Sequence, residues 1–188
     1  MSVALRTYTY ADLAEMPDDG NRYEVIGGEL IVAPAPTTNH QLVVTALTSL
    51  LWHHAVGQGL GQVFTAPTDV VLSPYNVVEP DIVFVSAARA RMVSAAAITG
   101  PPDLVIEVLS PRTRGYDLVR KKAMYATAGV PEYWIADPDR RTLLVYTLVD
   151  GEYDEVETTG GIIRSLVVPG FELTIADGFA GLKPEAEH

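Results

Sequence analysis

The sequence predicts an α/β fold, and two patterns in it carry this prediction. The first is a strand–helix–strand unit, in which apolar strands at residues 104–109 and 132–136 flank a helix over residues 117–128. Such units normally place their two strands parallel in one sheet. The second is a pair of two-residue turn signals at residues 27–28 and 150–151, each between two strand-like segments. These signals are typical of antiparallel hairpins.

The N-terminal part of the chain is predicted to hold two helices around the first hairpin. A short helix is expected over residues 7–16, because a capping threonine lies near its start and a proline follows it. The hairpin occupies residues 22–33. A long helix is then expected over residues 38–56, with Thr38 or Asn39 as its cap and a glycine after its last turn.

Further strands are predicted on both sides of the strand–helix–strand unit. Residues 62–72 contain one or two strands with a bend at a proline, and residues 81–85 form another. Residues 86–97 are rich in alanine and are expected to be helical. After the unit, a hairpin is predicted at residues 142–157 and a short strand near residues 171–175.

Length and composition favour one globular domain. A chain of 188 residues can bury a sizeable core, so we expect a single domain over residues 1–188, with a frayed tail at 181–188. No apolar run approaches the roughly 20 residues that span a bilayer. The N-terminus lacks the basic and apolar blocks of a secretory signal. The absence of cysteine excludes disulfides and thiolate metal sites. A cytoplasmic protein is expected.

The charge balance argues against a broad phosphate-binding surface. Thirteen basic residues stand against 24 acidic ones, a net charge of −11, whereas nonspecific nucleic-acid binding depends on clustered lysine and arginine. A local basic groove is not excluded. Five basic residues lie close together in the sequence: Arg112, Arg114, Arg120, Lys121 and Lys122.

One carboxylate, that of Glu107, interrupts the apolar strand at residues 104–109. An ionised carboxylate in such a strand is costly unless a cation or several donors meet it. On a helical wheel, Lys121 falls near the middle of the apolar face of the next helix, while Lys122 points roughly 100° away. The pattern pairs Glu107 with Lys121, either as a buried structural ion pair or as part of a site.

Asp81 opens another apolar strand, which is the next predicted strand before that of Glu107. If the two strands are neighbours, the two carboxylates can meet on the sheet. Paired carboxylates beside a lysine suit Mg²⁺ or Mn²⁺, which prefer oxygen ligands. The metal would polarise a phosphodiester and activate a water, and the lysine would orient that water or offset the growing charge.

These residues resemble the PD-(D/E)xK nuclease superfamily, and more closely the Uma-type endonucleases of bacteria. The resemblance covers nearly the whole chain, and its segments are RYEVIGGELIVAPAP at 22–36, His40-Gln41, EPDIVFVS at 79–86, PPDLVIEVLSP at 101–111 and DLVRKKAMYATAGVPEYWIADP at 117–138. It implies a restriction-endonuclease-like fold with a central mixed β-sheet flanked by helices. It also implies a Mg²⁺- or Mn²⁺-dependent endonuclease that hydrolyses phosphodiester bonds of DNA.

Carried onto this chain, the resemblance makes Asp81 and Glu107 the metal ligands and Lys121 the third catalytic residue. The superfamily lysine normally stands two residues after the second acidic residue, where this chain has Leu109. In this branch the lysine is expected on the following helix, as Lys121, which the helical wheel also selects. The departure leaves open whether Lys121 reaches the metal site or only braces Glu107.

Other polar residues are weaker candidates. The superfamily often adds an acidic residue from its N-terminal part, here Glu24 or Glu29, although exposed strand carboxylates are commoner. His40 could contact substrate from the start of the long helix. The remaining residues are expected to be structural, namely His53 and His54 in the helix's last turn, Tyr125, Tyr133 and Trp134 in the core, Asp117 as a cap and Asp137 in a turn.

Two other functions stay open on the sequence alone. A noncatalytic binding or assembly protein is favoured by the acidic charge and by the missing lysine at position 109. A small-molecule phosphodiesterase would present a closed pocket instead of an open groove. A nuclease, by contrast, is expected to show a basic cleft built from Arg112, Arg114, Arg120 and Lys122. Exposed strand edges near the terminal hairpin also allow a homodimer.

Overall fold

A six-stranded mixed sheet forms the centre of the computed structural model, which describes residues 6–17, 19–33, 35–110 and 117–182. Its strand order is β11-β10-β9-β8-β6-β3, and only the pair β8 and β9 is parallel within this order. The strands are β3 (Gly61–Thr65), β6 (Ile82–Ser86), β8 (Leu104–Val108), β9 (Glu132–Asp137), β10 (Thr142–Val149) and β11 (Glu152–Glu155).

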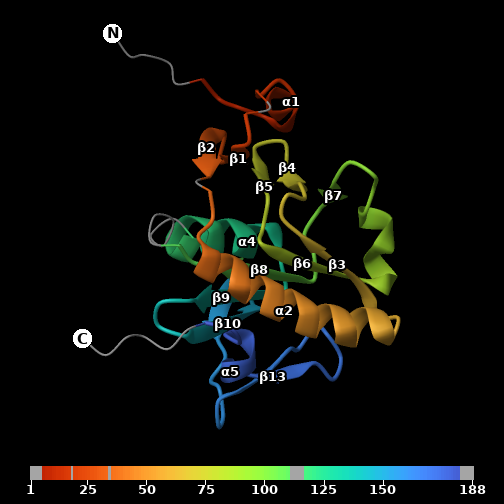
Figure 1. Ribbon diagram of the computed structural model, residues 1–188. Helices are drawn as coiled ribbons and strands as arrows, with labels where there is room; N and C mark the ends of the chain where they lie inside the picture. The colour runs from red at the N-terminus through yellow and green to blue at the C-terminus, as the bar shows by residue number, and fades with distance from the viewer. Residues whose placement is uncertain (1–5, 18, 34, 111–116, 183–188) are drawn as a thin grey trace, which may run out of the picture.

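A second sheet, of five strands, packs against this one and carries the N-terminal hairpin. Its order is β2-β1-β5-β4-β7, and Figure 1 shows β1, β2, β4 and β5 gathered at one end of the molecule. The strands are β1 (Arg22–Ile26), β2 (Glu29–Ala33), β4 (Val70–Ser73), β5 (Asn76–Val78) and β7 (Ile98–Thr99). A two-stranded sheet of β12 (Ile162–Arg164) and β13 (Glu172–Thr174) lies at the other end.

Helices cover the central sheet. The long helix α2 (Thr38–Gly57) runs across one face (Figure 1), and α4 (Lys122–Ala128) packs on the other. The shorter elements are α1 (Tyr10–Leu13), the 3₁₀ helix η1 (Ala87–Met92), the π-helical turn η2 (Asp117–Lys121) and α5 (Ile175–Gly178). Within the described part of the chain, no helix has the length and apolar character needed to cross a membrane.

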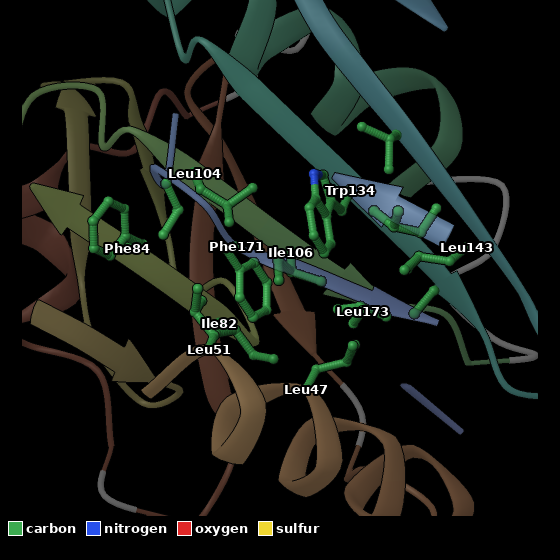
Figure 2. Packing of buried hydrophobic residues seen from close by; sticks show 14 of the residues in the cluster. Leu47, Leu51, Ile82, Phe84, Leu104, Ile106, Trp134, Leu143, Phe171 and Leu173 are labelled. Atoms are coloured by element: carbon green, nitrogen blue, oxygen red, sulfur yellow. The ribbon is translucent and has the colours of Figure 1, made fainter. Parts of the chain in front are cut away.

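Both faces of the central strands are buried. On the α2 face, Leu47 and Leu51 pack against Ile106 and Trp134 (Figure 2). On the opposite face, alternate residues such as Val105 pack with α4 and with the five-stranded sheet. Because successive side chains of a strand point to opposite faces, a strand covered on both sides reads as a continuous apolar run. A polar side chain within such a run therefore needs a partner inside the protein.

Most predicted elements are present. The strands β8 and β9 are parallel, and hairpins β1–β2 and β10–β11 turn at the expected positions. The long helix has its expected length, but the predicted caps Thr38 and Asn39 are wrong, since the Thr37 hydroxyl accepts the hydrogen bond from the His40 amide at 3.2 Å. The helix expected at 117–128 begins with a π-helical turn and ends before Gly129.

The predicted helix over residues 86–97 is also wrong. Only the 3₁₀ helix η1 forms, and the chain then turns into β7, which pairs with β4. Ser94 explains the break, because its hydroxyl oxygen accepts hydrogen bonds from the amides of Ala96 and Ala97 at 3.2 and 3.0 Å. A side chain that bonds nearby amides competes with helical hydrogen bonding. The strand β12 was not predicted, and α1 is shorter than residues 7–16.

Glu132 ties the C-terminal segment to the central sheet. This buried carboxylate accepts hydrogen bonds from the Trp134 indole Nε1 and from the Leu166 amide, both at 2.7 Å. Burial raises the pKa of Glu132, although hydrogen bonds from the segment at residues 165–167 oppose that shift. We therefore expect Glu132 to reinforce the packing of the C-terminal segment on the central sheet, where Phe171 also stacks on Trp134.

Replacing Glu132 by Ala is expected to lower the free energy of unfolding by about 2–4 kcal/mol, because the buried Trp134 indole and the partly buried Leu166 amide lose their acceptor. Urea unfolding measures the change. The matched control is Glu172→Ala, which removes an exposed carboxylate paired with Arg164 and is expected to cost about 0–1 kcal/mol. Equal unfolding midpoints for Glu132→Ala and the control would contradict this role of Glu132.

Candidate active site at the junction of the two sheets

Asp81 comes directly before β6, and Glu107 lies on the neighbouring strand β8. The ladder between β6 and β8 is antiparallel and pairs Ile82 with Ile106. Asp81 precedes Ile82 and Glu107 follows Ile106, so one further step of this register would pair the two residues. Both are buried, with relative exposures of 5% and 4%. The condition set from the sequence, that the two strands are neighbours, is met.

Three groups surround the Asp81 carboxylate. His40 Nε2 lies 3.0 Å from Oδ2, the Val108 amide donates to Oδ2 at 2.9 Å, and Arg22 Nη1 lies 3.6 Å from Oδ1. Burial alone would raise the pKa of Asp81, but His40, the Val108 amide and the charge of Lys121 together lower the pKa below its ordinary value. Asp81 is therefore ionised at neutral pH.

Lys121 joins Glu107 to the N-terminal hairpin. Its Nζ donates to Glu107 Oε1 at 3.0 Å and to Glu24 Oε1 at 2.9 Å, and all three side chains are buried. The Tyr125 hydroxyl also donates to Glu107 Oε1, at 2.7 Å. Burial and the nearby carboxylates raise the pKa of Tyr125 well above its usual value, so this hydroxyl stays a donor. These contacts explain how a carboxylate is tolerated in β8.

The structure separates the two hairpin candidates. Glu24 is buried, and besides Lys121 it accepts a hydrogen bond from the Glu79 amide at 2.9 Å. Glu29 is instead exposed and forms an ion pair with Arg120 at 2.8 Å. Residues 24, 25 and 26 are all buried, so simple alternation along β1 could not have identified Glu24. Glu24 is identified only by the position of the hairpin over η2, the turn that carries Lys121.

The histidines differ in their surroundings. His40 is buried against Asp81, and its Nδ1 has no hydrogen-bond partner in the part of the chain that the structure describes. His54 Nε2 lies 2.9 Å from the carbonyl of Pro169, a structural contact as expected. His53 is exposed on the same turn of α2.

The other residues expected to be structural are largely so. Tyr125, Tyr133 and Trp134 are fully buried, although Tyr125 also contacts Glu107. Asp137 accepts hydrogen bonds from the amides of Asp139 and Arg140, which forms the predicted turn. The side chain of Asp117 lies outside the described part of the chain.

Two of the four residues predicted to form a basic cleft lie in the described part of the chain. Arg112 and Arg114 lie outside the described residues. Arg120 is paired with Glu29, and Lys122 Nζ lies 3.5 Å from the centre of the Tyr146 ring. The cation beside Asp81 comes instead from Arg22, at the start of the first hairpin. Sequence reasoning missed Arg22, because its proximity to Asp81 depends on how the two sheets meet.

A pocket of about 500 Å³ opens beside Asp81. One wall is the outward side of α2 and the other is the connection between β3 and β4, with Arg22 and Asp81 at one side. The lining residues are Gly20, Arg22, Ala35, Pro36, Gln41, Val44, Thr45, Thr48, Ser49, Thr65, Ala66, Pro67 and Asp81.

The carboxylates have the right chemistry for a hard divalent cation. No three Asp, Glu or His side chains among the described residues converge to hold a metal ion by themselves. Mg²⁺, however, is usually bound by one or two carboxylates, with waters and substrate phosphates as its other ligands. Asp81 and Glu107 are two such carboxylates on adjacent strands, and the lowered pKa of Asp81 keeps it in the ligand form.

Comparison with known proteins gives the fold and the family. No curated protein matches the chain. A crystal structure of a protein from Anabaena variabilis, described as a "putative nuclease", is similar to it with a TM-score of 0.76 and 21% sequence identity, over 91% of this chain and 97% of that one. This likeness confirms the predicted α/β fold with mixed sheets flanked by helices. The sequence model described as "Putative restriction endonuclease" matches residues 10–176, and the chain therefore belongs to the Uma2 family.

Proposed function

We propose that the protein is a metal-dependent endonuclease that hydrolyses phosphodiester bonds of DNA. The observation that carries this proposal is a buried group in which Asp81 accepts a hydrogen bond from the amide of Val108, the residue after Glu107, and Lys121 lies 3.0 Å from Glu107. Membership of a family described as restriction endonucleases supports it. The known association of perturbed, buried ionisable groups with functional sites supports it further.

Asp81 and Glu107 would hold Mg²⁺ or Mn²⁺. When bound there, such an ion would polarise the phosphodiester and lower the pKa of the attacking water. Both carboxylates are oriented by neighbours of this chain, Asp81 by His40 and the Val108 amide, and Glu107 by Tyr125 and Lys121. Such oriented ligands need little rearrangement when a metal binds.

Two cations can act on the phosphate. Arg22 is partly exposed beside Asp81 and can donate to phosphate oxygens. Lys121 is buried behind Glu107 and can offset negative charge that grows as the phosphodiester reacts. Because Lys121 contacts Glu107 directly, it serves both the stability of the site and its electrostatics. A homodimer would present two such sites to the two strands of a duplex.

A second candidate function is hydrolysis of small phosphodiesters. The pocket beside Asp81 favours it, because a concave site of this size accommodates a small ligand. Within this candidate the same carboxylates and cations act on the same bond. The two functions differ only in whether the substrate extends beyond the pocket.

Cleavage assays test the proposal. Purified protein is expected to cut single-stranded DNA or plasmid with Mg²⁺ or Mn²⁺, to stop when EDTA is added and to resume when metal is restored. Asp81→Asn, purified identically, controls for a contaminating nuclease and is expected to be inactive. Cutting that persists in EDTA or in Asp81→Asn would contradict the proposal. Hydrolysis of bis(p-nitrophenyl) phosphate without any cutting of DNA would favour the second candidate.

A further inference from the structure

We propose that the pocket beside Asp81 binds one unstacked nucleobase of the substrate strand and that Trp52 stacks on the next base. The preferred substrate is then single-stranded or locally unpaired DNA. This inference rests on the proposed function, since it takes Asp81 as the place where the phosphodiester lies. It adds a binding site and a substrate class.

The size and walls of the pocket suit a base. Its volume of about 500 Å³ falls in the usual range for small-ligand sites. Val44 on α2 and Ala66-Pro67 on the β3–β4 connection provide apolar surfaces for the flat face of a ring. Hydroxyl and amide groups of α2 line the same space and can meet the edge of that ring.

The hydroxyl oxygens of Thr45 and Ser49 can accept hydrogen bonds from a bound base. Thr45 Oγ1 donates to the Gln41 carbonyl at 2.8 Å, and Ser49 Oγ donates to the Thr45 carbonyl at 2.7 Å. Since each hydroxyl hydrogen is already used, these oxygens offer the pocket acceptor positions. Thr48 also lines the pocket, and among the described groups none hydrogen-bonds its buried Oγ1. Amino and ring N–H groups on base edges are donors of the matching kind.

The position of Asp81 connects the base site to the bond that is cut. Arg22 and Asp81 line the same pocket, and Arg22 Nη1 lies 3.6 Å from Asp81 Oδ1. A base seated between α2 and the β3–β4 connection would therefore carry its own phosphate toward Arg22 and Asp81. The pocket thus selects the nucleotide next to the scissile phosphate.

Trp52 extends this site along α2. Its side chain is 54% exposed, which is unusual for a large aromatic residue. It lies four residues after Thr48, on the same face of the helix and about 6 Å further along its axis. Helical side chains lean toward the N-terminus, so a ring at this position can extend toward Thr48 at the edge of the pocket. An exposed aromatic ring is the usual platform on which single-stranded bases stack.

A base can enter such a pocket only after it leaves the duplex stack. The cost of extrusion is lowest for a base that is already unpaired. Binding to a single strand releases fewer counterions per neutralised phosphate than binding to a duplex does, and the stacking contact itself requires no cation. This fits a protein of net charge −11.

Binding measured without cleavage tests the inference. A fluorescently labelled oligothymidylate, oligoadenylate or oligocytidylate and the matching duplexes are titrated in EDTA at low ionic strength, with anisotropy as the readout. Emission from the exposed Trp52 is recorded in parallel, because the second tryptophan, Trp134, is fully buried. We expect tighter binding to single strands than to duplexes and quenching of the exposed indole.

The variants are Trp52→Ala, Trp52→Phe and Thr45→Leu, which fills the pocket from an exposed position of α2. Trp52→Ala and Thr45→Leu are expected to weaken single-strand binding about tenfold or more, whereas Trp52→Phe retains most of the affinity. The matched control is Tyr75→Ala, which removes an equally exposed aromatic ring away from the pocket and is expected to bind like the wild type. Urea unfolding is measured for every variant, and affinities are compared only among variants whose unfolding midpoint equals that of the wild type.

The two proposals can fail separately. Metal-dependent cutting of DNA with unchanged binding by Trp52→Ala and Thr45→Leu would overturn the inference and leave the proposed function standing. Variant-sensitive single-strand binding without cutting would support the inference and contradict the hydrolysis. Tighter binding to duplexes, or no binding of any oligonucleotide by the wild type, would overturn the inference.

Discussion

Replacing Glu107 by Gln is expected to abolish metal-dependent cleavage, with a loss in kcat of at least about 10²–10³-fold. The amide removes the negative charge that a divalent cation needs, but its oxygen can still accept the hydrogen bonds from Tyr125 and Lys121. The fold is therefore expected to persist. Single-turnover cleavage at saturating Mg²⁺ measures the loss, and urea unfolding checks that the variant is folded.

Glu29→Gln is the matched control for this variant. Glu29 belongs to the first hairpin and is exposed, where it pairs with Arg120 on the surface. Removing its charge is expected to leave cleavage within about twofold of the wild type, since exposed ion pairs contribute little. A folded Glu107→Gln protein that cleaves as well as Glu29→Gln would rule out Glu107 as a metal ligand.

Replacing Lys121 by Met is expected to lower the free energy of unfolding by about 3–5 kcal/mol. Loss of the ammonium leaves the buried carboxylates of Glu24 and Glu107 without the cation between them, and an uncompensated buried charge is costly. Urea unfolding at neutral pH measures the change. Lys122→Met is the matched control, because its ammonium lies over the Tyr146 ring and its loss is expected to cost about 0.5–1 kcal/mol.

A double variant isolates the electrostatic part of this effect. In the Glu107→Gln background one of the two carboxylates is neutral, so Lys121→Met is expected to destabilise the protein less than it does alone. Additive effects of the two substitutions would indicate that Lys121 stabilises the fold by packing instead of by charge. A Lys121→Met protein as stable as Lys122→Met would contradict the buried pairing altogether.

The sequence was sufficient to predict the strand–helix–strand unit, but not the contacts that the rest of the chain makes with it. The strand β8 is a continuous apolar run and the helix after it has an apolar face, so Glu107 stood out in one and Lys121 in the other, and the structure joins them at 3.0 Å. These residues are only 14 positions apart. Glu24 reaches Lys121 from 97 positions away, and nothing in the local pattern of β1 marks its orientation.

The contacts of Asp81 were unpredictable for the same reason. His40 is 41 positions away in α2, and Arg22 lies in the other sheet, so both depend on how the layers pack. Local competition accounts for two of the other differences. The Ser94 side chain ends an alanine-rich segment that propensity alone predicts to be helical. Thr37 caps α2 by accepting a hydrogen bond from the His40 amide, in place of the expected caps Thr38 and Asn39.

Binding of Mn²⁺, followed by electron paramagnetic resonance of the free ion, tests the central claim most directly. The wild type is measured with a cleavage-resistant phosphorothioate oligonucleotide, beside Asp81→Asn, Glu107→Gln and the control Glu29→Gln. The account predicts binding by the wild type and by Glu29→Gln, and its loss in both other variants. Equal Mn²⁺ binding by all four proteins, or none by the wild type, would contradict a metal site at Asp81 and Glu107.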